Sequence, residues 1–249
     1  MSEPFRIGYA PGVIPDKWSR IWAERLPGSP LEADPVDDGV RALHTGAADM
    51  CFVRLPVERD GLHVIPLYTE VPVVVVAKDH PVAVFEEVAV ADLADEHLLQ
   101  DPDDVPAWRE VAIELREGSR ADVPAMSIKQ AIEVVAAGAG IVIVPMSVAR
   151  LHHRKDVVHR PVSDVEGAQV ALAWLVDNED PRVETFVGIV RGRTARSSRG
   201  GDDGGSRESS GSSGTNGRGD RRTAGRAASD RRPASRGRKS PRRGPGGHR

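Results

Sequence analysis

The sequence predicts an α/β protein built from two α/β units, followed by a C-terminal tail that does not fold. Short apolar runs with strand or helix periodicity alternate along residues 5–192. Their order at the start, β-α-β-α-β, favours a parallel sheet flanked by helices. Residues 193–249 contain no Val, Ile, Leu, Met or aromatic residue. They cannot bury enough apolar surface to offset the entropy of ordering, so we expect this tail to be disordered.

The first unit opens with a strand at residues 5–9, where apolar residues alternate with others. Ala10-Pro11-Gly12 forms a turn. A helix follows, and its apolar stripe contains Trp18, Ile21, Trp22 and Leu26. The unit continues with a weaker strand, a short helix and a third strand, at residues 31–36, 38–45 and 50–53.

Two further strands, at residues 63–67 and 71–77, lie on either side of Thr69-Glu70. The second is apolar at nearly every position, which is typical of a strand covered on both faces. We therefore expect the chain to pass from the first unit to the second at Thr69-Glu70. It returns with an apolar strand at residues 168–176 and a last helix that begins at Asp180-Pro181.

The second unit has its clearest signals in a helix at residues 127–138. Ser127 and Gln130 have capping-box spacing, and Gly138 suits the C-terminal end. Another helix begins at Pro106 and places on one apolar face Trp108, Val111, Ala112 and Leu115. Strands are expected at residues 97–100, 122–126, 141–144 and 157–162, a helical turn at 89–94 and a helix at 146–152.

The tryptophans and the cysteine are expected in the core. Trp18, Trp22, Trp108 and Trp174 lie on apolar stripes. Cys51 is the single cysteine of the chain and lies in an apolar run. We therefore expect a buried, unreactive thiol and no intrachain disulfide.

Charge is distributed unevenly along the chain. The tail holds 16 Lys and Arg against 5 Asp and Glu, whereas residues 1–192 hold 18 against 32. The overall net charge of −3 therefore combines an acidic body with a basic arm. Basic clusters in the tail are suited to non-specific contact with nucleic acid phosphates. A flexible solubilising tail is the alternative, and it is the simpler interpretation.

No signal for export, membrane insertion or catalysis stands out. Met1-Ser2-Glu3-Pro4 has no basic region followed by an apolar one, and the apolar stretch at 71–77 is too short to cross a bilayer. We expect a cytoplasmic protein without membrane contact. The eight histidines lack metal-ligand spacing, and no phosphate loop or nucleophile elbow is present. No catalytic residue, metal or cofactor is predicted.

Three stretches, taken in order, resemble the effector domains of LysR-type transcriptional regulators. Residues 67–83 resemble the hinge strand and the "DHPLA" segment of that family. Residues 88–96 are similar to its "sLaDLad" turn, and residues 127–145 to its "s…a…lVaaGlGialLP" block. With this spacing the resemblance covers residues 5 to about 191.

The resemblance implies a periplasmic-binding-protein-like fold of two α/β lobes with a hinge between them. A small effector would bind in the cleft, and effector domains would pair as homodimers. The expected domain is residues 1–192, with lobe I at about 1–69 and 163–192 and lobe II at about 70–162. The tail, residues 193–249, lies outside it.

One feature departs from the family pattern. The family carries a winged helix-turn-helix and a linker helix before the effector domain. Here the first strand begins at Phe5, which leaves no room for either. The expectation is a sensing module without its own helix-turn-helix, unless an in-frame one is encoded upstream of Met1.

Candidate ligand contacts follow from the position of loops at strand ends and helix starts. They are Ala10, Pro11, Gly12, Val13, Thr69, Gln100, Asp101, Ser127 and Ile128. Ser127 has the best physical case, because a helix start offers free amides and the positive end of the macrodipole. Its hydroxyl is equally explained as a helix cap. For Thr69, pairing within the hinge strands is slightly favoured over a ligand contact.

The chemistry of the effector stays open at this point. The loop at residues 10–13 has no hydroxyl for a carboxylate, and Glu70, Asp101, Asp103 and Asp104 are acidic. This disfavours a strongly anionic effector and leaves neutral or cationic ones. The main hypothesis is a small-molecule sensor in transcription control. The alternatives are a nucleic-acid-associated factor acting through the tail and, last, an enzyme on the same fold, for which no acid–base pair or nucleophile is visible.

Overall fold

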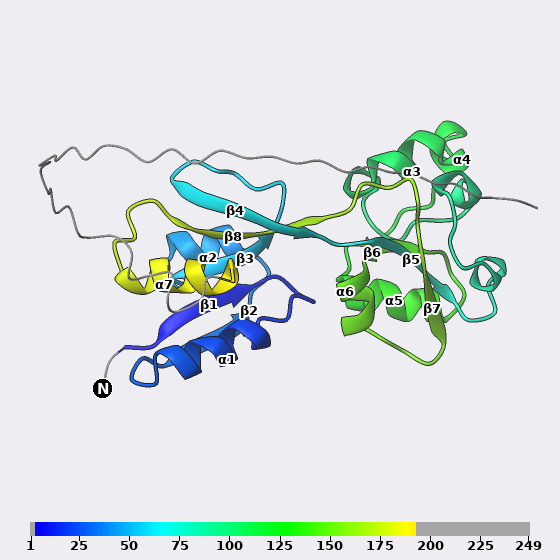
Figure 1. The fold of residues 1–249 in the computed structure, drawn as a ribbon. Coiled ribbons are helices and arrows are strands. Elements are labelled where there is room, and N and C mark those ends of the chain that lie inside the picture. The colour runs from blue at the N-terminus through cyan, green and yellow to red at the C-terminus, as the bar shows by residue number, and fades with distance from the viewer. Residues whose placement is uncertain (1–2, 193–249) are drawn as a thin grey trace, which may run out of the picture. The chain divides into compact units, whose positions relative to one another are not determined.

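The computed structural model describes residues 3–192, which form two β-sheets with helices against their faces (Figure 1). The disorder predicted for residues 193–249 concerns a part of the chain outside those described. We call the part around the first sheet lobe I and the part around the second sheet lobe II. No helix among residues 3–192 is long and apolar enough to span a membrane.

Lobe I contains a five-stranded sheet of order β2-β1-β3-β8-β4. Its strands are β1 (Phe5–Tyr9), β2 (Leu31–Pro35), β3 (Met50–Arg54), β4 (Leu62–Thr69) and β8 (Gln169–Leu175). As predicted, β1 pairs in parallel with β2 and with β3. The sheet is nevertheless mixed, because β8 runs antiparallel to both β3 and β4.

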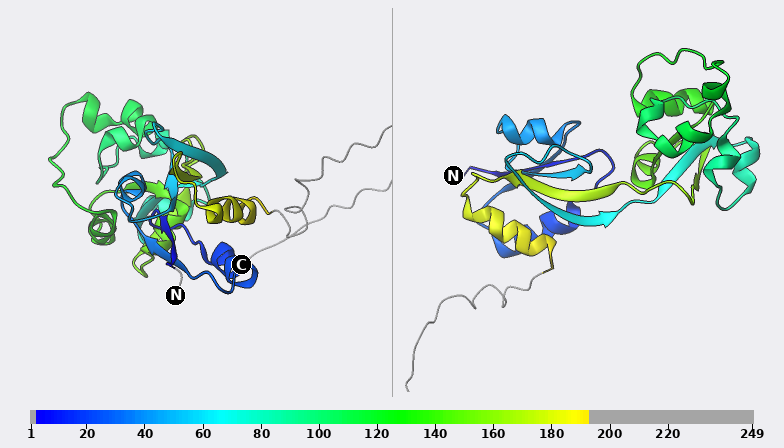
Figure 2. Two further views of the ribbon diagram at one scale, coloured as in Figure 1. Left: turned by 90° about the vertical axis from the view of Figure 1, so that its left-hand side faces the viewer. Right: turned by 90° about the horizontal axis from the view of Figure 1, so that it is seen from above.

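Helices cover both faces of this sheet. The helices α1 (Asp16–Arg25) and α7 (Pro181–Val190) lie on one face and α2 (Gly39–His44) on the other (Figure 2). Side chains of β3 alternate between the two cores: Phe52 lies in the core under α1 and α7, whereas Cys51 packs beside α2. We call the first core the aromatic cluster, because its rings contact one another; they are those of Phe5, Trp18, Trp22, Phe52 and Phe186. In the aromatic cluster the rings of Phe5 and Trp22 are stacked with centroids 5.0 Å apart.

Lobe II contains a three-stranded antiparallel sheet of order β6-β5-β7. The strands are β5 (Pro72–Ala77), β6 (Val142–Pro145) and β7 (Val157–Pro161). The central strand is buried on both faces, as its apolar run predicts. Val74 and Val76 enter one core, and Val73 and Val75 enter the other.

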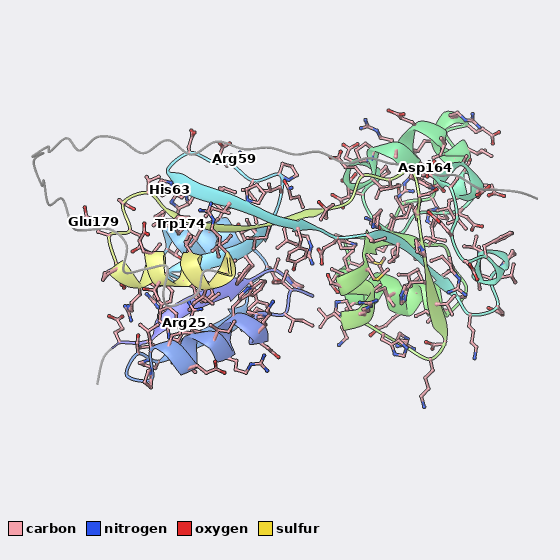
Figure 3. All side chains as sticks on the ribbon, viewed as in Figure 1. Arg25, Arg59, His63, Asp164, Trp174 and Glu179 are labelled. Carbon is pink, nitrogen blue, oxygen red and sulfur yellow. The ribbon has the colours of Figure 1, made fainter. Side chains whose placement is uncertain are left out.

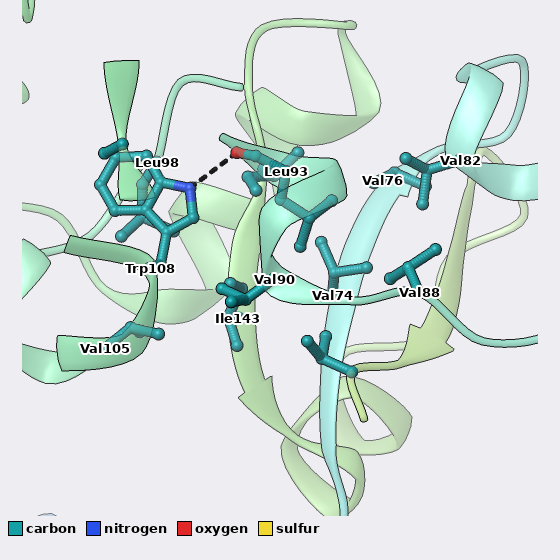
Figure 4. Packing of buried hydrophobic residues seen from close by; sticks show 13 residues of the cluster. Val74, Val76, Val82, Val88, Val90, Leu93, Leu98, Val105, Trp108 and Ile143 are labelled. Carbon is teal, nitrogen blue, oxygen red and sulfur yellow. Dashed lines mark hydrogen bonds between the residues drawn. The ribbon is translucent and has the colours of Figure 1, made fainter. Parts of the chain in front are cut away.

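The two faces of this sheet are covered differently. On one face lie α5 (Ile128–Ala136) and α6 (Met146–Leu151). On the other lie α3 (Pro106–Val111), α4 (Ile113–Arg116) and three short 3-10 turns, η1 (Pro81–Val84), η2 (Val90–Leu93) and η3 (Pro102–Asp104). Trp108 is fully buried there, and its indole Nε1–H donates to the carbonyl of Leu93 at 2.9 Å (Figure 4).

Three predicted elements of lobe II were wrong. The helix from Pro106 breaks at Ala112, which is extended (φ −56°, ψ 119°), and the amide of Ile113 donates to Ala94 instead. Residues 97–100 form no strand beyond a single bridge between Leu98 and Ile141. Residues 122–126 form no strand either, in keeping with Pro124, which lacks the amide that a ladder needs.

The prediction that all four tryptophans lie in the core is confirmed for two of them. Trp22 and Trp108 are fully buried, whereas Trp18 and Trp174 are only partly buried at the edge of the aromatic cluster. Trp174 lies near the end of β8, where its ring packs against that of His63 on β4, with the ring centroids 5.2 Å apart (Figure 3). Cys51 is fully buried, as predicted.

The chain crosses between the lobes twice, and the two crossovers touch. The amide of Glu70 donates to the carbonyl of Ala168 at 2.9 Å. A Cβ added at Gly167 would lie 2.4 Å from the carbonyl oxygen of Glu70. Since real Cβ atoms do not approach so closely, only glycine fits there, and the contact fixes where the two lobes are joined.

Candidate functional site

A cavity of about 1340 Å³ is lined by residues of both lobes. Lobe I contributes the loop after β1, the start of α1, the segment after β2 and the end of β3. Lobe II contributes Asp104 at the end of η3, the start of α5 and both ends of α6. We call this cavity the cleft. Its walls are mainly apolar side chains with charged residues between them, an arrangement typical of small-molecule sites.

The loop after β1 approaches lobe II closely. Gly12 has a φ of +89°. A Cβ at Gly12 would lie 2.7 Å from Ser147 Oγ and 2.9 Å from the carbonyl carbon of Ser147, at the start of α6. Val13, 3 % exposed, anchors the loop in the aromatic cluster. A glycine is therefore required for the backbone of lobe I to lie against α6.

Ser127 is the N-cap of α5, and its capping box is fully formed. Its Oγ accepts from the amide of Gln130 at 3.3 Å, and the side-chain oxygen of Gln130 accepts from the amide of Ser127 at 2.9 Å. The hydroxyl is thus occupied as a cap, yet the residue is exposed and lines the cleft. The helix start retains the partial positive charge that first-turn amides provide.

Arg54, at the end of β3, was missed by the sequence analysis. Its Nε donates to Glu70 Oε2 at 2.6 Å, and its Nη2 donates to Ser147 Oγ at 3.0 Å. The Glu70 side chain is only 6 % exposed and that of Arg54 20 %. Arg54 therefore connects lobe I, the crossover and lobe II at the cleft. A charged residue directly after a buried strand, at the carboxyl edge of a parallel sheet, was an available signal.

The predicted contacts separate into three groups. Pro11, Gly12, Val13, Ser127 and Ile128 line the cleft. Two others line a smaller adjoining cavity of about 580 Å³ in lobe II, to which Ile128 also contributes: Gln100 and Asp101. Two line neither cavity: Ala10, whose amide donates to Phe52 within the sheet, and Thr69, which pairs with Gln169. A ligand-binding role for each of the nine stays a prediction.

Gln100 has a structural role in addition. The backbone of Ile141 pairs with His97 and Leu99, and this forms the single bridge. The side-chain Oε1 of Gln100 accepts from the amide of Ile143 on β6 at 2.8 Å, so this amide is not available to extend the bridge into a ladder. Arg120 Nη2 donates to the carbonyls of Leu98 at 2.8 Å and Gln100 at 3.0 Å.

Two titratable groups at the cleft are shifted by their surroundings. Burial, with the nearby Asp101 and Asp103, raises the pKa of Asp104. Burial, with the nearby Lys129, lowers the pKa of His152. The second shift favours neutral His152 at neutral pH, so the positive charge of lobe II at the cleft comes from Lys129 and Arg150.

Neither the thiol nor a metal cluster offers chemistry at the cleft. Burial raises the pKa of Cys51 to about 12, and this residue lies in the core under α2. Residues 3–192 contain no group of three or more His, Cys, Asp or Glu side chains that could hold a metal ion. The arrangement supports binding by hydrogen bonds, charge and apolar contact.

Comparison with known proteins identifies the relatives of this chain. The sequence profile of the LysR substrate binding domain matches residues 10–195. A probable hydrogen peroxide-inducible genes activator from Mycobacterium avium is 30 % identical over 208 residues, covering 80 % of this chain and 60 % of the relative. The chain spans about three-fifths of the length of the first curated relatives it matches.

Solved structures confirm the predicted fold class. The OxyR C206S mutant of Corynebacterium glutamicum, bound to H2O2, has a TM-score of 0.60 at 25 % identity, covering 77 % of this chain and 65 % of that one. The BenM effector binding domain with its effector benzoate has a TM-score of 0.57 at 20 % identity, covering 78 % and 93 %. The second likeness shows the fold alone.

Proposed function

Because this chain belongs to the LysR substrate-binding domain family, we propose that residues 1–192 sense a small effector in transcription control. The effector binds in the cleft between the lobes. The observation that carries this proposal is the cavity of about 1340 Å³ lined by both lobes. A ligand that contacts both walls binds one relative placement of the lobes better than others, and so shifts their equilibrium.

The proposed sensor has two lobes and a set of ligand contacts between them. Lobe I comprises residues 1–69 and 163–192 and lobe II residues 70–162, with the paired crossovers as the hinge. Pro11, Gly12, Val13, Ser127 and Ile128 are the proposed contacts, and Arg54 and Ser147 join them because they meet at the cleft. Gln100 and Asp101 are proposed for the adjoining cavity, whereas Ala10 and Thr69 have weaker support.

Recognition is proposed to be non-covalent and without catalysis. One relative is named as a peroxide-inducible activator and one solved relative binds benzoate, so two kinds of signal are represented. A thiol that reacts with peroxide needs an accessible, low-pKa sulfur. Cys51 is the single cysteine of the chain, is buried and has a raised pKa. This supports a bound metabolite as the signal. We further propose that the protein is cytoplasmic and forms homodimers through its effector domains.

A thermal-shift screen of carboxylates, amines, amino acids, sugars and aromatic compounds tests the proposal. Any compound that binds the native state alone raises Tm in proportion to the logarithm of its concentration over Kd. Ile14 is 71 % exposed and lines the cleft, so Ile14→Trp obstructs it without disturbing a core. Val84→Trp, at an 81 % exposed site outside the cleft, is the matched control.

The expected result is a hit whose Tm shift disappears in Ile14→Trp and persists in Val84→Trp. A screen without hits across all of these classes contradicts the sensing proposal. Equal shifts in both variants would place the ligand outside the cleft.

A second candidate function rests on the charge of the tail. Residues 193–249 hold 16 Lys and Arg against 5 Asp and Glu, and we propose that they contact nucleic acid without reading its sequence. Gel shifts of the full chain and of a chain ending at Gly192, over a salt series, test this. Binding should weaken with salt and vanish on truncation. Binding that survives truncation, or its absence at low salt, rules the tail out.

A further inference from the structure

The two walls of the cleft carry opposite net charges. Asp16 and Asp37 line it from lobe I with one basic residue, Arg54, which is paired with Glu70. Lys129 and Arg150 line it from lobe II with one acidic residue, Asp104. Asp16, Asp37, Lys129 and Arg150 are exposed, and their side chains form none of the hydrogen bonds or ion pairs found within residues 3–192. No ion pair therefore joins these four residues across the cleft, and their charges remain available to a ligand.

The net positive charge on the lobe II side of the cleft is opposite in sign to the net charge of residues 1–192. Residues 1–192 hold 32 Asp and Glu against 18 Lys and Arg, yet residues 146–160 hold four Lys and Arg and one Asp. This stretch includes α6 and leads through β7. Of these four, Arg150 lines the cleft, whereas Arg154 pairs with Asp156 and Arg160 donates to the carbonyl of Ala83. Arg150 and Lys129 together outnumber Asp104 on the lobe II wall, which favours an anionic group of the ligand on that side.

Arg54 adds a directional donor beside this wall. Glu70 compensates its charge at 2.6 Å, and Ser147 accepts from its Nη2. Its Nη1 makes no hydrogen bond within residues 3–192 and is not among the buried unpaired atoms there. The guanidinium therefore retains N–H groups that a carboxylate oxygen in the cleft accepts from.

Lobe I has the complementary chemistry. Its loop at residues 10–13 is Ala-Pro-Gly-Val and has no side-chain donor. Apart from Arg54, the charged side chains that lobe I contributes to the cleft are Asp16 and Asp37. When they are ionised, these carboxylates accept hydrogen bonds and donate none. A purely anionic ligand would meet like charge here, whereas an ammonium group would be stabilised.

We propose that the effector is amphoteric, with a carboxylate held toward Arg54, Lys129 and Arg150 and a protonated amine held toward Asp16 and Asp37. This inference rests on the proposed function, because it specifies the ligand of the same cleft. A ligand with one charge leaves one wall unpaired. A zwitterion pairs with both walls at once, and by bridging them it favours a placement of the lobes in which both walls reach it.

Titration calorimetry with two matched probe sets at neutral pH tests the inference. The aromatic set is benzoate, benzylamine and 4-(aminomethyl)benzoate, and the aliphatic set is hexanoate, hexylamine and 6-aminohexanoate. In at least one set the zwitterion should bind about tenfold more tightly than either singly charged analogue, which corresponds to one added charge-assisted contact.

Paired variants assign the charges to the walls. Asp16→Asn with Asp37→Asn should weaken zwitterion binding about tenfold and leave carboxylate binding unchanged or stronger. Lys129→Gln with Arg150→Gln should weaken both zwitterion and carboxylate. Asp95→Asn, at an exposed lobe II carboxylate outside the cleft, is the control and should change neither.

The outcomes separate this inference from the proposed function. If a singly charged analogue binds as tightly as its zwitterion, or the paired Asp variant leaves the zwitterion unaffected, the amphoteric assignment is wrong while the sensing function stands. If none of the six probes binds, the assignment is also wrong. The sensing function itself fails only when the broader thermal-shift screen finds nothing.

Discussion

The two lobes are stabilised by different kinds of interaction. Lobe I relies on a continuous five-stranded ladder and an aromatic core in which Phe186 packs against Phe5, Trp22 and Phe52. Lobe II has only three strands, and side-chain hydrogen bonds from Gln100 and Arg120 satisfy backbone groups of Leu98, Gln100 and Ile143. Periodicity is therefore informative in lobe I, whereas lobe II depends on contacts between residues distant in sequence.

Removing the central ring of the lobe I core should have the largest effect. Phe186 is fully buried, and Phe186→Ala should lower the free energy of unfolding by about 3–5 kcal/mol, through lost burial and the cavity left behind. Urea unfolding measures it. The control, Phe85→Ala, truncates a ring that is 55 % exposed and should cost under about 0.5 kcal/mol. Similar losses in both variants would contradict a core-dependent lobe I.

An intermediate effect is expected where a side chain satisfies backbone carbonyls of lobe II. Arg120 pairs with Glu114 and donates to the carbonyls of Leu98 and Gln100. Arg120→Met leaves these acceptors unpaired and should cost about 2 kcal/mol. Amide hydrogen exchange should accelerate at residues 97–104 with no change in lobe I.

The matched control for that variant is Arg109→Met. Arg109 pairs with Asp103 on the surface, where the two side chains are 50 % and 74 % exposed. Solvent screens such pairs, so the loss should stay under about 0.5 kcal/mol. Unchanged exchange at residues 97–104 in Arg120→Met would mean that packing, not this arginine, orders the segment.

The smallest effect is expected at the start of α5. Ser127→Ala removes the cap to the amide of Gln130 and should lower the free energy of unfolding by about 1 kcal/mol. Ser19→Ala, inside α1, is the control and should be nearly neutral, because the higher helix propensity of alanine offsets the loss of the long 3.3 Å bond from the Ser19 hydroxyl to the carbonyl of Pro15. A neutral Ser127→Ala would show that the capping box adds nothing to lobe II.

Much of the fold was predictable because its signals are local. The apolar run of β5, the capping box at Ser127 and the turn at Gly12 are each encoded within a few residues. The break at Ala112 was not predictable, because it depends on the carbonyl of Ala94 accepting from Ile113. Nor was the missing strand at 97–100, where the side chain of Gln100 accepts from the amide of Ile143 on β6.

The site follows the same division. Positions at strand ends and helix starts were found by their place in the fold, and five of the nine line the cleft. Arg54 was missed although its place at a strand end was a signal, and its contact with Ser147, 93 residues away, could not be predicted because it forms only when the two lobes come together. Lys129 and Arg150 were missed because an exposed charge on a helix has no local sign of facing a cavity.

The buried thiol of Cys51 has a practical use. With its pKa raised to about 12 and its side chain enclosed, the chain's one natural cysteine should not react with maleimide or nitroxide reagents at neutral pH. Cysteines introduced at Ile14 and Leu151, exposed residues on opposite walls of the cleft, can then be labelled without removing it. A pair of probes at these positions provides a spectroscopic ruler for the distance between the lobes, free and with effector, in an otherwise unaltered sequence.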